Sequence, residues 1–308
     1  MPDNGTLGLA PHDCIKPAAG TRRCRICLQP LRCRLSYLDD PPARPLPRHL
    51  EFAVISNPIL TPPPRSGLFR YAAPHLFYGL AGRLLPWFAV AAAVLAAVGL
   101  AIGFFVAPTD AQQGDSYRII FIHVGTAWMA MFLYVVMAGW AGIGLAFNTR
   151  LSAMMASAVA PTGALMAFLS LWTGALWGRP TWGAYWVWDA RLTSTLILLF
   201  LYLGFIALQA AIDDPRRADR AGAILALVGV VNVPIIYFSV KWWNTLHQGA
   251  SVGLARSSMA TPMLLAMLLT ALALWLYCIA AVLARVRVVI VEREKRAAWM
   301  RDLLAAEH

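Results

Sequence analysis

The residues best suited to chemistry lie in one short stretch, WGRPTWGAYWVWDARLT, which covers residues 177–193. It combines aromatic rings, one carboxylate and two guanidinium groups, and a long apolar run flanks it on each side. This density of rings exceeds what anchoring at a membrane edge requires. Stacked aromatic faces can instead support a large, flat, apolar ligand. The candidate ligand-binding residues here are Trp182, Tyr185, Trp186, Trp188, Asp189 and Arg191.

The conformation of this stretch decides which rings face the same way. If it is helical, the spacing i, i+3, i+4 and i+7 predicts a single face formed by Trp182, Tyr185, Trp186 and Asp189. Trp188 would then point elsewhere. Gly178 and Pro180 are expected to break the preceding helix and to let the chain turn back sharply.

Two histidines, His123 and His247, lie within or between the apolar runs of the chain. A lone histidine near a helix end more often packs with a hydrogen bond than binds a metal. Beside an aromatic shelf, however, two neutral imidazoles suit haem, whose iron takes imidazole as an axial ligand. We therefore predict that His123 and His247 are the axial pair of one iron, in a haem b that is carried as cargo.

The two haem propionates require cations or hydrogen-bond donors. The candidates on the same side of the membrane are Arg118, Arg191, Lys241 and Thr193. Pairing with Asp189 or with lipid phosphate is an equally open role for Arg191. Trp242 is a candidate haem contact, although with Trp243 it also fits an interfacial belt. Asp189 is expected to cap the following helix or to orient Arg191, because no nucleophile or second acid lies beside it.

Composition places these residues in a membrane protein. Of the 308 residues 59% are hydrophobic and only 13% are charged, whereas soluble domains are usually about half apolar and a quarter charged. Six apolar runs are long enough to span a bilayer as helices: Leu84–Ala107, Ile119–Phe147, Ala153–Trp177, Leu192–Ile212, Ala221–Val240 and Thr261–Ala284. We predict an all-α bundle of six transmembrane helices. Pro161 and Pro234 should kink their spans, and Asn232 should satisfy a freed carbonyl or bond across helices.

The net charge of +11 reports membrane orientation rather than nucleic-acid binding, because the arginines flank the apolar runs. The side that holds both chain ends also holds Arg150, Arg216 and Arg217, and few cations lie opposite. The positive-inside rule therefore puts both termini in the cytoplasm. On the outer side it places His123, the tryptophan-rich loop and His247.

Residues 1–74 and 286–308 flank the predicted membrane domain at 75–285. The first segment is rich in proline and arginine and is expected to be a disordered cytoplasmic arm. It contains Cys14, Cys24, Cys27 and Cys33, for which free thiols are expected and a zinc site is the alternative. Cys278 is expected to pack in a helix. The last segment is expected to form a short cytoplasmic helix.

The tryptophan-rich stretch resembles the WWD motif of haem-handling membrane proteins, most closely the CcmC family (haem exporter protein C). Three further segments support the resemblance: Gln112-Gln113-Gly114 with Ser116–Ile120, His123-Val124, and Trp242–Gly249. It extends from about Leu84 to the C-terminus. Tyr185 departs from it, since many relatives carry another tryptophan there.

The resemblance implies delivery of haem at the periplasmic face of the bacterial inner membrane to the haem chaperone CcmE, for c-type cytochrome biogenesis. The implied partners are the ABC transporter subunits CcmA and CcmB, the small membrane subunit CcmD, membrane lipid and no nucleic acid. We expect no enzyme, because the chain carries no Walker A pattern for ATP hydrolysis. The alternatives are a b-type cytochrome that carries electrons and a solute transporter.

Overall fold

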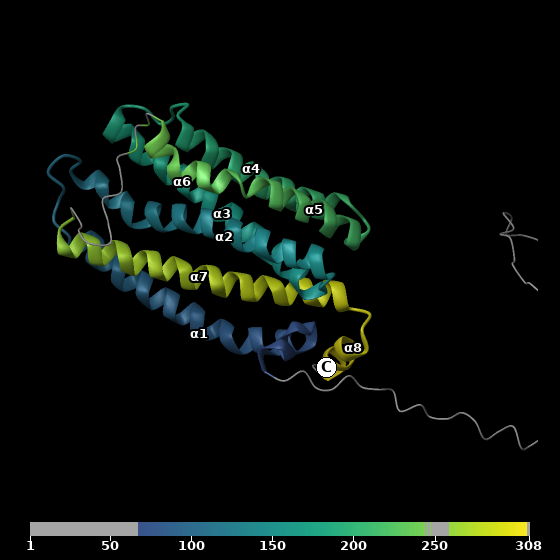
Figure 1. Ribbon diagram of the computed structural model, residues 1–308. Coiled ribbons are helices and arrows are strands. Elements are labelled where there is room, and N and C mark those ends of the chain that lie inside the picture. The colour runs from purple at the N-terminus through teal and green to yellow at the C-terminus, as the bar shows by residue number, and fades with distance from the viewer. Residues whose placement is uncertain (1–66, 244, 246, 248–258, 307–308) are drawn as a thin grey trace, which may run out of the picture. The chain divides into compact units, whose positions relative to one another are not determined.

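The computed structural model describes residues 67–243, 245, 247 and 259–306. Six segments of this part are helical, long and apolar enough to cross a membrane, which confirms the predicted all-α architecture of six spans (Figure 1). The α-helices are α1 (Pro74–Ala101), α2 (Ile120–Phe147), α3 (Arg150–Trp182), α4 (Ala190–Ala211), α5 (Pro215–Gly229), α6 (Asn232–Trp242), α7 (Thr261–Glu294) and α8 (Ala298–Ala306). A π-helix, Ile102–Val106, extends α1, and 3-10 helices cover Gly67–Ala72 and Asp115–Ile119.

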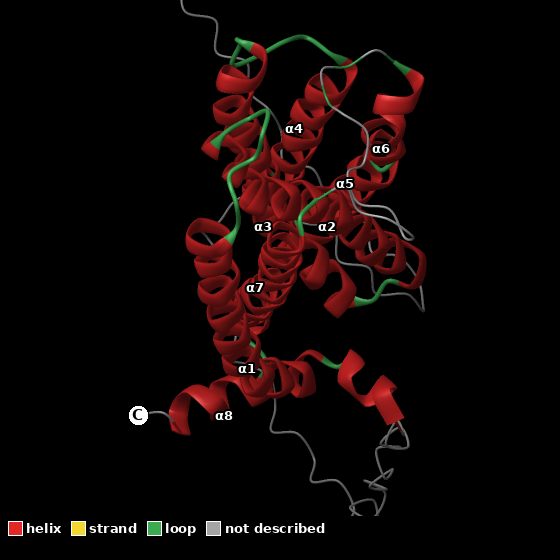
Figure 2. Ribbon diagram, turned by 90° about the vertical axis from the view of Figure 1, so that its left-hand side faces the viewer, coloured by secondary structure: helices red, strands yellow, loops and turns green. Residues whose placement is uncertain are grey.

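The spanning helices are arranged in three tiers. Helix α1 packs on α7, and α7 packs on α2 and α3. On their other side α2 and α3 are covered by α4 and α5, and α6 lies on α4. Figure 1 shows this order from α1 to α4, and the turned view in Figure 2 shows the same succession. Helices α2 and α3 are therefore the central pair, to which the other tiers attach.

The fifth predicted span consists of two helices. Helix α5 ends at Gly229 and α6 begins at Asn232, so the break precedes Pro234. Pro234 lies in the first turn of α6, where a missing N–H costs no helical hydrogen bond. The Asn232 side-chain amide donates to the Ser194 carbonyl of α4 over 2.8 Å. Of the two roles expected for Asn232, the structure shows the bond across helices.

Helix α3 is longer than the sequence predicts. It runs for 33 residues without interruption and contains both Pro161 and Pro180. The expected break at Gly178 and Pro180 is therefore wrong. The helix ends instead at Trp182, and the next residue, Gly183, has a φ of +77°, the left-handed conformation that favours glycine. At the other end of the chain α7 continues to Glu294, beyond the predicted limit of the span at Ala284, and α8 follows it.

The core between α2, α3 and α4 centres on two tyrosines. Tyr134 and Tyr202 are both fully buried and meet edge to face, with 4.9 Å between their ring centroids. The Tyr202 hydroxyl donates to the Ala130 carbonyl over 2.8 Å. Gly163 of α3 packs directly against the Tyr202 ring and leaves no room for a Cβ atom. This close approach fixes the spacing of α3 and α4.

Near the C-terminal end of α7, one arginine joins four helices. Arg293 binds both carboxylate oxygens of Asp219 on α5, at 2.7 and 2.9 Å. Its guanidinium also donates to Gln209 on α4 over 3.1 Å and to Ser157 on α3 over 3.3 Å. Two parallel bonds to one carboxylate give this pair a defined geometry. The end of the bundle opposite the tryptophan-rich loop is thereby held closed.

The predicted N-terminal arm lies outside the described residues as far as position 66, and so do Cys14, Cys24, Cys27 and Cys33. Residues 67–72 form a short 3-10 helix, and α1 follows from Pro74. Cys278 is a free thiol, 2% exposed, in the packed interior of α7. This burial agrees with the expected packing role.

We expect Gly163→Ala to destabilise the bundle by about 1–3 kcal/mol, the usual cost of overpacking a filled core. The added methyl group would collide with the Tyr202 ring. Thermal unfolding of the purified protein measures the change. Gly139→Ala on α2 is the matched control, because a Cβ atom there meets nothing within 4 Å. Equal stability of the two variants would contradict the packing described here.

Candidate functional site

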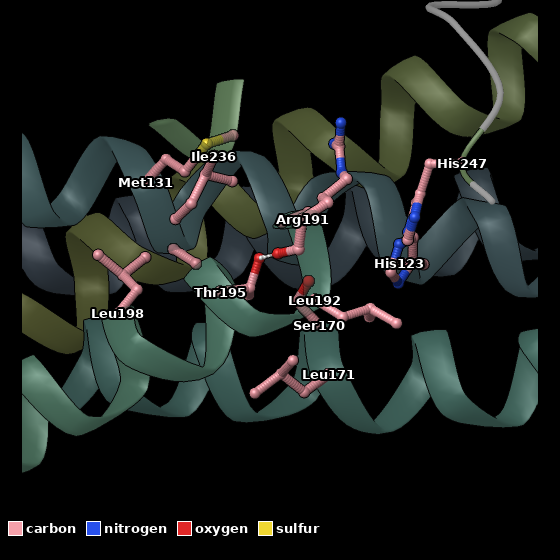
Figure 3. Close-up of a pocket in the computed structure, with 12 residues that line it drawn as sticks. His123, Met131, Ser170, Leu171, Arg191, Leu192, Thr195, Leu198, Ile236 and His247 are labelled. Atoms are coloured by element: carbon pink, nitrogen blue, oxygen red, sulfur yellow. Dashed lines mark hydrogen bonds between the residues drawn. The ribbon is translucent and has the colours of Figure 1, made fainter. Parts of the chain in front are cut away.

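A pocket opens between α2, α3, α4 and α6 near the tryptophan-rich loop. Most of its wall is apolar, and its charged or titratable groups are His123, Arg191 and His247. Figure 3 shows both histidines at one end of the pocket, and Leu198, Ile236 and Met131 at the other. The lining residues are His123, Ala127, Ala130, Met131, Ser170, Leu171, Arg191, Leu192, Thr195, Leu198, Ile236 and His247. The structure thus brings together two histidines that lie 124 positions apart in the sequence.

His123 lies in the first turn of α2, and the Nδ1–Cε1 edge of its ring faces α3. Its Nδ1 atom is 3.0 Å from the Thr173 hydroxyl oxygen. Gly174, which follows Thr173 in the chain, leaves the space that the imidazole ring needs, since a Cβ atom at this position would lie 3.1 Å from His123 Cε1. One turn further, the Trp177 ring meets the imidazole edge to face at 5.6 Å. Three residues of one helix face therefore fix the ring of His123.

His247 lies in the connection between α6 and α7. Its Nδ1 atom is 3.6 Å from Asp189 Oδ2, and both side chains are largely buried, at 14% and 9% exposure. Its ring centroid is 5.3 Å from that of Trp182. Burial lowers the pKa of His247, the Arg191 charge lowers it further, and the Asp189 carboxylate opposes both effects. The net shift favours the neutral imidazole, the form that binds a metal.

Two tryptophans connect the histidines. Trp177 and Trp182 approach each other with 6.4 Å between centroids, so the rings of His123, Trp177, Trp182 and His247 form a continuous series. The Trp177 indole N–H donates to the Gln113 side chain over 2.8 Å. Trp177 and Thr173 were not among the site residues predicted from the sequence. Their spacing of four residues predicts that both lie on one face of α3. Only the structure shows that this face meets His123.

The tryptophan-rich loop is not a helix, so the condition for a single face of Trp182, Tyr185, Trp186 and Asp189 is not met. Residues 183–189 connect the end of α3 to α4 without regular structure. Trp186 and Trp188 meet edge to face at 5.4 Å. Trp188 is 77% exposed and Tyr185 is 60% exposed, whereas Trp182 and Trp186 are partly buried. Extended loop geometry therefore turns some of the rings inward and the others outward.

Asp189 has two contacts, one from each carboxylate oxygen. Oδ1 accepts from the Leu192 backbone N–H over 2.7 Å and so caps α4, as expected. Oδ2 faces His247 at 3.6 Å. Asp189 therefore ties the start of α4 to the loop that carries His247.

Of the two arginines predicted to bind the propionates, one lies in the pocket and the other lies outside its lining. Arg191 lines the pocket, whereas Arg118 does not. The Arg118 guanidinium contacts Asp115 at 3.0 Å and the carbonyls of Gly103 and Ala107. It holds the α1–α2 connection together.

The other outward cations and rings lie away from the pocket lining. Lys241 lies over the Phe238 ring at 5.9 Å, and Trp242 stacks on the same ring at 5.1 Å. Trp242 is 58% exposed. Its position at the end of α6 fits contact with a bound ligand and contact with the membrane surface equally well.

These positions suit binding rather than acid–base catalysis. A neutral imidazole donates a lone pair to a metal, and here two imidazoles share one apolar pocket. The tryptophan faces beside them supply flat apolar area. Arg191 supplies a positive charge at the same end of the pocket. The arrangement fits a planar, anionic ligand with a central metal.

Comparison with known proteins gives consistent matches over most of the chain. The family model described as Heme exporter protein C matches residues 67–301. The protein of that name from Escherichia coli is 46% identical over 237 residues, which are 77% of this chain and 96% of its own length. That from Bradyrhizobium diazoefficiens is 49% identical over 76% of this chain and 89% of its own length. That from Paracoccus denitrificans is 39% identical over 76% and 98%, respectively.

We expect substitutions of Asp189 to separate its two contacts. Asp189→Asn keeps a good helix cap, whereas Asp189→Ala loses it and should cost about 1 kcal/mol of stability. Both changes remove the carboxylate that raises the pKa of His247, so this pKa should fall further below its ordinary value. Thermal unfolding and an NMR titration of the histidine ring measure the two effects. An unchanged His247 pKa in Asp189→Asn would contradict the pairing.

Proposed function

We propose that this chain, which belongs to the Heme exporter protein C family, holds haem at the outer face of the inner membrane. It would deliver this haem for c-type cytochrome biogenesis. The relatives' name describes haem export, and the match extends over nearly the whole length of the Escherichia coli protein. The recipient would be a periplasmic haem chaperone of the CcmE kind. The haem is cargo, so the site must both bind it and release it.

One observation carries the proposal: His123 and His247 line the same pocket. Each has an oxygen atom next to its Nδ1 atom, the Thr173 hydroxyl at 3.0 Å and the Asp189 carboxylate at 3.6 Å. Metal-binding histidines commonly donate one ring N–H to such an oxygen and bind the metal through the other nitrogen. The Thr173 contact thus prepares His123 to bind iron through Nε2. The Asp189 carboxylate lies beside His247 Nδ1 but beyond hydrogen-bond distance, and we propose the same orientation for His247 once haem is bound. Two imidazole ligands fit a haem of the b type, which is held without a covalent bond.

The surroundings of the pair fit the rest of the haem molecule. The faces of Trp182 and Trp186 offer apolar area to the macrocycle, and the deep end of the pocket is lined by residues such as Leu198 and Ile236. Arg191 is the pocket residue suited to a propionate. Thr193, Lys241, Trp242 and Arg118 lie outside the pocket lining and remain candidates for contacts at its rim.

The distribution of charge supports a periplasmic location of the site. The Arg293 cluster and Arg150 lie at the opposite end of the bundle from the tryptophan-rich loop, and cytoplasmic ends of membrane helices are enriched in arginine. The exposed rings of Tyr185 and Trp188 lie beside the pocket and offer a surface for the recipient protein. CcmA, CcmB and CcmD are the proposed partners within the inner membrane, alongside lipid.

We expect the purified protein to contain low-spin haem with two histidine ligands. His123→Ala or His247→Ala should each open one coordination position, shift the optical spectrum towards high spin and lower the haem content. Free imidazole should restore the low-spin spectrum in either variant. His75→Ala is the control, because its ring packs against Trp299 and not at the pocket. An unchanged low-spin spectrum of His247→Ala, without a substitute ligand, would refute the paired-ligand proposal.

We expect a cysteine at position 184 of the tryptophan-rich loop to react with a membrane-impermeant thiol reagent in intact cells. The background should lack the native cysteines, and the periplasm should be accessible to the reagent. A cysteine in place of Arg217, in the first turn of α5 at the opposite end of the bundle, should react only after lysis. The reverse pattern would show that the site faces the cytoplasm.

A further inference from the structure

We propose that Thr173 is the positioning residue that keeps the Nδ1 atom of His123 protonated and thereby makes Nε2 the nitrogen that binds the haem iron. The inference rests on the proposed function, and it assigns a role to a residue of α3 that would not itself touch haem. Its basis is the direction of the hydrogen bonds around one hydroxyl group.

The Thr173 hydroxyl has a single proton, and that proton already has an acceptor. The Leu169 carbonyl lies 2.6 Å from Thr173 Oγ1, and the Ser170 carbonyl lies 3.3 Å away. A hydroxyl group donates once and accepts through its lone pairs. Its contact with His123 Nδ1 at 3.0 Å must then use a lone pair. Nδ1 is therefore the donor, and the neutral ring carries its free lone pair on Nε2.

Gly174 and Trp177 hold the ring in the position that this bond requires. The absence of a side chain at Gly174 lets His123 Cε1 approach α3 closely. The Trp177 ring contacts the imidazole from one turn further along the same helix. With its Nδ1 and Cε1 atoms against α3, the imidazole cannot turn over without losing both contacts. One face of α3 thus sets both the position of the His123 ring and the nitrogen that carries its proton.

The two histidines are held by different groups, and this has a consequence for release. His123 is on a helix and pairs with a neutral hydroxyl on another helix at 3.0 Å. His247 is in a connecting segment and faces a carboxylate at 3.6 Å. Loops move more readily than packed helices. Thr173 therefore holds His123, the ligand that stays in place. His247 is the ligand suited to leave when the cargo is transferred.

Two substitutions of Thr173 separate the effect of its hydroxyl group from the effect of its side-chain volume. Thr173→Val keeps the shape and removes the acceptor, and Thr173→Ser keeps the acceptor. Loss of such a partner commonly lowers metal affinity by about 10–100-fold. We expect a loss of this size for haem in Thr173→Val, with recovery in Thr173→Ser. The reduction potential should rise in Thr173→Val, because an imidazole without its acceptor is a weaker electron donor to iron.

The matched control is Thr162→Val on the same helix. Thr162 is also buried, at 3% exposure, and its hydroxyl has no hydrogen-bond partner among the described residues. This variant should leave haem affinity and reduction potential unchanged. Gly174→Ala provides a second test that retains the hydroxyl: the new methyl group would lie 3.1 Å from Cε1 and should displace the ring, which gives the same loss of affinity.

Nitrogen-15 NMR of histidine-labelled protein without haem tests the inference independently of the proposed function. The His123 signals, assigned by their loss in His123→Ala, should show the Nδ1-protonated ring in the wild-type protein and a mixture of both neutral forms in Thr173→Val. An Nε2-protonated ring in the wild-type protein would overturn the role of Thr173. Haem binding that is indifferent to His123→Ala would instead refute the proposed function, whatever the NMR result.

Discussion

The uninterrupted length of α3 is the constraint on which the site depends. Its 33 residues correspond to about 50 Å at 1.5 Å per residue, whereas a bilayer core is about 30 Å thick. Thr173, Trp177 and Trp182 lie in the C-terminal third of this helix. A break at Gly178, as the sequence suggested, would separate the contacts of His123 from those of His247. Continuity through Pro180 keeps them on one rigid element.

The pocket is lined both by tightly packed helices and by the segment between α6 and α7 that carries His247. Helices α2, α3 and α4 are locked by the Tyr134–Tyr202 contact, and the other end of the bundle is closed by Arg293. His247, in contrast, is linked to this framework through Asp189 and Trp182. One imidazole on a fixed helix and one in a connecting segment is an arrangement that suits a protein that must both bind and release its cargo.

The sequence predicts the helices well, because about 20 consecutive apolar residues have one stable conformation in lipid. It also selects His123, His247 and Asp189 as candidates, since few polar groups remain in an apolar chain, and the structure places the two histidines at one pocket with Asp189 beside His247. It does not predict the conformation of residues 183–189, where ring stacking and the Asp189 cap outweigh helical spacing. Thr173 resembles any threonine bonded to its own helix until His123 is placed beside it. The sequence likewise does not predict that Arg118 donates to a carbonyl of the α1–α2 connection.

A haem-loaded structure that resolves the axial ligands tests the central claim most directly. We expect the iron between the Nε2 atoms of His123 and His247, with Thr173 on Nδ1 of the former and Asp189 on Nδ1 of the latter. Haem bound at the tryptophan-rich loop with its iron on neither histidine, or on only one of them with the other ring turned away, would contradict the claim.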